Sequence, residues 1–286
     1  MGQTAFNGIV TGMIIGLPAL AVTLLFGILK FPNFAVGAMM TLGAYLAFTL
    51  NVLLGWPLSV AAGAAAAGLG VICIAIDRVT FRPLRDRGGV TLMVASLGVA
   101  FILENLTRLA YGNATRSFAI ELARPLRFMG IRMNEEQLMA IAIAALTMVA
   151  MYLLLTRTSL GRAMRAIADN PSLAQVRGID TRRMIRWTWF IAGVLIAISG
   201  VLVAMDRSLE PPMGTNYIII VFAAAILGGL GSPAGALLGA LCIGLVSELS
   251  TLVLSPAYRM GVPLCVIALV LLLRPQGLFG LAQIKK

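Results

Sequence analysis

The sequence predicts an all-α integral membrane protein, a bundle of about eight or nine transmembrane helices with broken helices and a cytoplasmic loop. Three observations support this fold class. Of the 286 residues, 60% are hydrophobic and only 12% are charged, and the mean hydropathy is +0.97, which differs strongly from soluble domains. Long uncharged apolar runs recur along the chain, and most basic residues lie in the connections between particular pairs of runs. The chain is therefore expected to cross a membrane many times.

A transmembrane helix needs about 20 mainly apolar residues, and nine runs approach that length. They leave only short connections, so residues 1–286 are predicted to form a single transmembrane domain, and any large soluble function belongs to partner chains. The expected crossings are residues 8–29, 33–54, 57–76, 90–110, 138–156, 187–206, 216–230, 234–254 and 260–273.

The first crossing is interpreted as a retained helix. The first 29 residues contain no Lys or Arg, so the positively charged segment that opens a cleavable signal peptide is missing. Several later crossings carry small residues four apart, a spacing that lets two helix backbones approach closely. These pairs are Gly12 with Gly16, Gly63 with Ala67, Gly235 with Gly239, and Ala240 with Gly244.

Two crossings are predicted to be broken. The segment LKFPNFAVG begins at Leu29 and LGGLGSPAG begins at Leu227, and both place Pro, Gly and a polar residue between apolar runs. Unpaired backbone groups at membrane depth are tolerated only where protein or a water-filled cavity satisfies them. We therefore predict that the breaks contribute to a translocation pathway, with Asn33, Phe34, Gly37, Gly231 and Ser232 as candidates.

The distribution of basic residues predicts the orientation. Fifteen of the 22 Lys and Arg residues fall on one face, in the connections at residues 77–89 and 157–186, at Lys30 and after residue 273. The positive-inside rule makes that face cytoplasmic. An odd number of crossings then places the N-terminus outside, in the periplasm, and the C-terminus in the cytoplasm.

Two acidic residues, Glu104 and Glu248, fall inside predicted crossings, where an ionisable side chain is a functional candidate. Glu104 lies near the outer end of its helix, where it reaches water or pairs with Arg108 one turn later. Glu248 lies past the midpoint of residues 234–254. Three interpretations stay open for Glu248: it lines a polar path, it forms a structural ion or hydrogen-bond pair across helices with a partner such as Arg259, or it snorkels to the surface. It is included among the candidates for the translocation pathway.

The loop at residues 157–186 is predicted to contain two short helices. Leu160, Ala163, Met164 and Ile167 form one apolar stripe at helical spacing. Further along, Asn170 is placed to cap a second helix that Pro171 opens, Gly178 to end it, and Asp180 to cap the helix of the next crossing. Such a rigid projection suits the groove of a partner protein. A helix lying on anionic lipid is the alternative, because the arginines of the loop also suit that surface.

Composition excludes several classes of function. The chain has no His, and its three Cys residues lie in apolar runs, which argues against imidazole catalysis and His/Cys metal sites. The string GGLGSPAG has no following Lys-Ser/Thr, so no phosphate-binding loop is expected. The sequence shows no basic segment interleaved with aromatic residues, so nucleic-acid binding is not expected. The net charge of +11 is instead explained by the excess of Lys and Arg expected on the cytoplasmic face of a membrane protein.

Five segments together are informative. One is the loop described above, and the others are GILKFPNFAVGAMMTLGAYLAF at residues 27–48, RPLR at 82–85, LGGLGSPAGALLGA at 227–240 and RPQGLFG at 274–280. In their order and spacing they resemble the Liv-type permease subunits of bacterial ABC importers for branched-chain amino acids. The resemblance covers nearly the whole chain.

The resemblance implies a permease subunit that moves branched-chain amino acids, or related small amino acids or amides, inward across the bacterial inner membrane by ATP-driven alternating access. The implied partners are a second related permease, two cytoplasmic ATPases that bind ATP and Mg, and a periplasmic binding protein. This chain would hold no cofactor and no ATPase site. Ala174 and Gly178 match the Ala-xxx-Gly core of the ATPase-contacting loop, although the leading Glu-Ala is absent. The residues expected to couple to the ATPase are Leu160, Gly161, Arg162, Arg165, Ala174, Gly178, Ile179 and Asp180.

The alternative function is a channel or ion-coupled secondary transporter that works alone on a small polar solute. Broken helices and Glu248 suit that class, but it gives no reason for a structured basic loop. Dependence of transport on ATP separates the two.

Overall fold

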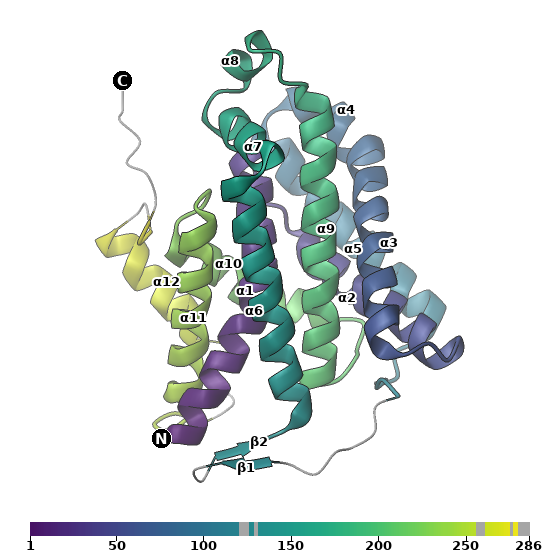
Figure 1. The fold of residues 1–286 in the computed structure, drawn as a ribbon, viewed down its shortest axis with the longest axis vertical. Coiled ribbons are helices and arrows are strands. Elements are labelled where there is room, and N and C mark those ends of the chain that lie inside the picture. The colour runs from purple at the N-terminus through teal and green to yellow at the C-terminus, as the bar shows by residue number, and fades with distance from the viewer. Residues whose placement is uncertain (120–125, 129–130, 256–260, 275–276, 280–286) are drawn as a thin grey trace.

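The computed structural model describes residues 1–119, 126–128, 131–255, 261–274 and 277–279. Figure 1 shows a bundle of long helices that run roughly parallel to one axis. The helices, in order, are α1 Gly2–Leu29, α2 Ala35–Phe48, η1 Thr49–Leu53, α3 Leu58–Ile76, η2 Asp77–Phe81, α4 Arg82–Leu84, η3 Arg85–Arg87, α5 Gly89–Tyr111, α6 Glu135–Arg157, α7 Ser159–Asp169, α8 Pro171–Val176, α9 Thr181–Asp206, α10 Met213–Gly228, α11 Pro233–Ser250 and α12 Val262–Leu273.

The all-α membrane fold is confirmed. Seven helical segments in the described residues are long and apolar enough to cross a membrane. They correspond to the expected crossings except 216–230 and 260–273, where α10 has 16 residues and α12 has 12. The expected crossing at 234–254 is also shorter, since α11 ends at Ser250. One small strand pair, β1 Leu126–Phe128 with β2 Ile131–Met133, is antiparallel and was not predicted.

The core of the bundle is formed around α1 and α9. In the most apolar stretch of each helix, 78% of the residues of α1 and 72% of those of α9 are buried, against 17% for α5 and 22% for α6. Helix α1 is apolar on all sides, as a helix surrounded by others must be. It packs against α11, α9, α10 and α6, so a movement of α1 would displace its contacts with all four helices.

Small residues set the distance between the central helices, as predicted. A Cβ atom on Gly244 of α11 would lie 2.5 Å from Cα of Gly12 in α1, and one on Gly12 would lie 2.9 Å from Cα of Leu241. At Gly63, in contrast, a Cβ would meet nothing within 4 Å. Among the residues that the structure describes, Gly63 therefore does not serve helix packing.

The two ends of the bundle differ in character. Helices α4, α7 and α8 lie at one end, called here the loop end (Figure 1). The N-terminus and the β1–β2 pair lie at the opposite end (Figure 1). Helices α1 and α6 run towards the loop end, whereas α9 runs back from it and α11 is antiparallel to α1. These directions follow the alternating path expected of successive crossings.

Candidate functional site

The loop between α6 and α9 folds into two capped helices, as predicted. Thr158 Oγ1 accepts a hydrogen bond of 3.1 Å from the Gly161 amide at the start of α7. Asn170 Oδ1 accepts one of 3.0 Å from the Leu173 amide at the start of α8, which Pro171 opens. Each cap satisfies a backbone N–H that a helix start leaves free. The loop is therefore a structured element.

The sharp end of α8 depends on Gly178. Its φ of +80° is in the left-handed region, where a side chain is strained. Its amide donates to the Gln175 carbonyl at 2.9 Å, and the next amide, that of Ile179, donates to the Ala174 carbonyl at 3.0 Å. This is a Schellman arrangement. Asp180 then caps α9 by accepting from the Arg183 amide at 3.0 Å, so the predicted stop and restart are both confirmed.

The inner face of the loop is packed onto the bundle. Met164, Ile167 and Ala174 are buried, while Leu160 and Ile179 are half-buried. Gly161 is buried as well, and a Cβ there would collide with the Leu154 and Leu155 carbonyls at the end of α6. The apolar stripe predicted for α7 is therefore its contact with the bundle, and the corner between α6 and α7 has no room to collapse further.

A hydrogen bond joins α7 to the central helix α1. Lys30, the residue that ends α1, donates from Nζ to the Ala168 carbonyl in α7 at 2.9 Å. Lys30 itself has φ +58°, an uncommon conformation for a residue with a side chain. From the sequence, Lys30 is only one charge of the cytoplasmic face. A single Lys directly after a long uncharged helix, two residues before Pro32, was the available signal for this contact. The bond gives α7 a direct connection to the core.

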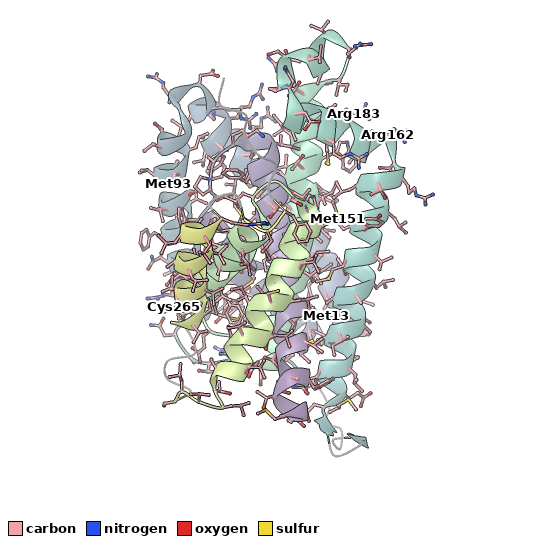
Figure 2. The ribbon with its side chains drawn as sticks, turned by 90° about the vertical axis from the view of Figure 1, so that its left-hand side faces the viewer. Met13, Met93, Met151, Arg162, Arg183 and Cys265 are labelled. Carbon is pink, nitrogen blue, oxygen red and sulfur yellow. The ribbon has the colours of Figure 1, made fainter. Side chains whose placement is uncertain are left out.

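The outer face of the loop is basic and partly apolar. Arg162 and Arg165 are exposed, as are Gly178 and Asp180. Figure 2 shows Arg162 and Arg183 at the loop end, on α7 and α9. On α8, the apolar side chains of Leu173 and Val176 are 56% and 84% exposed. This combination suits an acidic partner surface with apolar pockets.

The first predicted break is confirmed and is sealed by protein. Asn33 is 1% exposed, and its Oδ1 accepts from the Ala35 amide at 3.0 Å. The Phe34 amide donates to Ser96 Oγ of α5 at 3.0 Å, and the Phe34 ring lies 4.9 Å from that of Phe222 in α10. Gly37 lies against the backbone of α10, where a Cβ would clash. The break holds α2, α5 and α10 together.

The second predicted break is also confirmed, at the turn between α10 and α11. Gly229 and Gly231 have φ of +102° and +94°, and Ser232 Oγ accepts from the Gly235 amide at 3.2 Å as the cap of α11. The carbonyls at the end of α10 accept from the amides of Leu278 and Phe279. The freed backbone groups are thus paired within the chain. A Cβ on Gly27 would lie 3.9 Å from Gly231, which places the turn near the loop end.

Glu248 lies elsewhere, at the end opposite the loop. It is 8% exposed and accepts a hydrogen bond of 3.2 Å from Thr11 Oγ1. A polar cavity of about 560 Å³ adjoins it, lined by Asn7, Val10, Thr11, Gln137, Asp206, Arg207, Ser208 and Glu248. The candidates for one pathway therefore lie at opposite ends of the bundle, and their shared pathway stays a prediction. Arg259, the partner suggested for Glu248, lies outside the described residues, as does part of RPQGLFG.

The predicted pair of Glu104 and Arg108 forms, and a third residue joins it. Arg108 Nη2 donates to Glu104 Oε1 at 2.5 Å, and Thr215 of α10 donates from Oγ1 to Glu104 Oε2 at 2.7 Å. The sequence contained no signal for Thr215, because its contact with α5 spans more than a hundred residues.

Comparison with known proteins agrees with the architecture. Residues 4–271 match the family described as "Branched-chain amino acid transport system / permease component". The chain is 31% identical to the high-affinity branched-chain amino acid transport system permease protein LivH of Escherichia coli, and 31% identical to BraD of Pseudomonas aeruginosa; each match covers 99% of this chain and 97% of the relative. The structure resembles PsaBC from Streptococcus pneumoniae, solved with a Fab, with a TM-score of 0.53 at 12% identity, covering 96% of this chain and 92% of that one.

Proposed function

This chain belongs to the family of branched-chain amino acid transport permease components, and from that membership we propose that it is the membrane-spanning subunit of an ATP-driven importer. Its substrates are branched-chain amino acids or related small amino acids and amides. It works by alternating access with a second related permease, two ATPases that bind ATP and Mg, and a periplasmic binding protein. The membrane is the bacterial inner membrane, and the N-terminus is periplasmic.

The capped loop of α7 and α8 is the observation that carries this proposal. A stand-alone channel needs no rigid basic projection, whereas a subunit driven by ATPases needs a surface that receives their movement. The loop has an exposed face with Arg162, Arg165, Leu173 and Val176 and an inner face packed on the bundle. A push on the exposed face is therefore passed inward instead of being absorbed by a flexible loop.

The path of that push follows from the contacts. Lys30 Nζ joins α7 to the end of α1, and α1 is the most buried of the long helices. Along α1, Gly8, Gly12 and Gly16 lie against α11. Surfaces of small residues let packed helices shift by small amounts without opening voids. We therefore place the moving element at α7 and α1, with α11 as the surface along which α1 slides.

The experiment is uptake of labelled leucine, isoleucine, valine and urea into proteoliposomes that contain this chain, its co-purifying partners and a binding protein. ATP-dependent accumulation of an amino acid is the expected result. Equilibration at the same rate without ATP, or by this chain alone, would overturn the proposal in favour of a channel or secondary transporter.

A further inference from the structure

Two lightly buried helices, α5 and α6, have the same length of 23 residues and different exposed surfaces. The large exposed side chains of α6 within its span are apolar, such as Ile143, Leu146 and Val149. Its Thr147 hydroxyl is turned back to the Ile143 carbonyl at 2.7 Å. An apolar surface with its hydroxyls satisfied internally suits lipid. Helix α6 therefore provides an internal reference for a lipid-facing surface.

Helix α5 carries charge where α6 carries none. Its exposed stripe runs through Val90, Val94, Leu97 and Phe101, residues at the spacing of one helix face. The stripe then continues into Asn105 and Arg108, which are exposed, and borders Glu104, whose side chain is 12% exposed. Glu104 lies seven residues, or about 10 Å, before the end of the helix. Its ion-pair partner Arg108 is 41% exposed. Asn105 Nδ2 donates to the Phe101 carbonyl at 2.8 Å, so its amide is paired within the helix, as the Thr147 hydroxyl of α6 is. An ion pair with a half-exposed guanidinium is costly against lipid, so this part of α5 is expected to face water.

The first turn of α10 completes the polar surface. Thr215 donates to Glu104 at 2.7 Å, and both Thr215 and Asn216 are exposed. This turn is held inside the bundle, because the Gly214 amide donates to Thr41 Oγ1 of α2 at 2.9 Å in a buried contact. The polar groups therefore belong to a fixed surface shared by two helices.

We propose that Glu104, Arg108 and Thr215 line a water-filled passage on the exposed side of α5 and bind the charged ends of an amino acid zwitterion in transit. The proposal rests on the proposed function, and the second permease would form the other wall. Glu104 complements the ammonium group, with Thr215 holding its second oxygen, and Arg108 complements the carboxylate. Phe101 and Ile219 are exposed one turn further towards the loop end, where they would contact an aliphatic side chain.

The first test measures access of water to α5 in the assembled complex and needs no substrate. Asn105→Cys is compared with Leu146→Cys on α6, in a chain whose exposed Cys242 and Cys265 are replaced by Ala. We expect a membrane-impermeant thiol reagent to modify the cysteine at position 105 at least tenfold faster than the one at position 146. Equal, slow modification of both would overturn the passage.

The second test separates substrate binding from a purely structural ion pair. Glu104→Gln and Arg108→Gln should each lower ATP-dependent leucine uptake at least tenfold with the complex still assembled, while Glu135→Gln, an exposed carboxylate at the start of α6, leaves uptake unchanged. The exchange Glu104→Arg with Arg108→Glu restores an ion pair but reverses the site. Recovery of uptake in that double variant would overturn the binding role. If the unmodified complex shows no ATP-dependent uptake, the proposed function fails, while the labelling of position 105 still decides whether α5 lines a passage.

Discussion

The substitution Asn170→Ala tests whether the order of α8 matters for energy coupling. Helix α8 has only six residues, and a helix that short has little stability of its own. It is held by Pro171 at its start, by the Schellman turn at Gly178, and by the 3.0 Å bond from the Leu173 amide to Asn170 Oδ1. Replacing Asn170 by Ala removes that cap while leaving the other two features in place.

The magnitude follows from the value of a single cap. Loss of an Asn N-cap costs about 1 kcal/mol, which lowers the ratio of ordered to disordered α8 about fivefold at 25 °C. The membrane bundle is expected to be unaffected, because Asn170 is exposed and its side-chain bond is to Leu173 within the loop. We therefore expect a local loss of order with unchanged assembly of the complex.

Two measurements check this expectation. Amide hydrogen exchange in residues 173–177 should become about fivefold faster, with exchange in α9 unaffected, and the amount of leucine taken up per ATP hydrolysed should fall two- to fivefold. Ser172→Ala is the matched control, since this exposed neighbour is not the cap. Faster exchange with normal coupling would refute the reasoning that an ordered α8 transmits force, and unchanged exchange would refute the cap argument itself.

Three further variants and one control test the rest of the coupling path and the core. Arg162→Glu together with Arg165→Glu should uncouple ATP hydrolysis from uptake without affecting membrane insertion, and normal uptake would show that this face does not receive the ATPase. Lys30→Met removes the bond from α1 to α7, so ATPase activity should persist while uptake falls severalfold; unaltered uptake would exclude this bond from the path. Gly244→Ala places a methyl group against the α1 backbone and should lower stability by about 1–3 kcal/mol, seen as earlier thermal unfolding of the purified complex, whereas Gly63→Ala, which meets open space, should not destabilise it.

The parts of the molecule that sequence reasoning anticipated are local in the chain. The caps at Asn170 and Asp180 each involve an amide three residues away, and the left-handed turn at Gly178 follows from the residue itself. The same holds for the two breaks, where Pro and Gly interrupt apolar runs. Such features need no knowledge of the neighbours, so they are determined by short stretches of sequence.

The apolar runs set the number and order of helices, but they contain little information about which faces meet. Most spans are apolar on all sides, and lipid and neighbouring helices are similarly apolar surroundings, so no amphipathic pattern marks the buried side. Asn33, Ser232 and Glu248 were assigned to one pathway from the helix breaks and from a carboxylate inside a crossing. The fold places Ser232 near the loop end and Glu248 at the opposite end, which the sequence could not indicate.

The sequence by itself determined the membrane class, the order of the crossings, the breaks and the capped loop, because composition and contacts within five residues specify them. Only the tertiary structure decided that Lys30 holds α7, that Thr215 joins the ion pair on α5, and that α5 differs from α6 in its exposed face. These contacts join residues more than a hundred positions apart. They depend on how each helix is rotated and packed, which no local pattern of residues specifies.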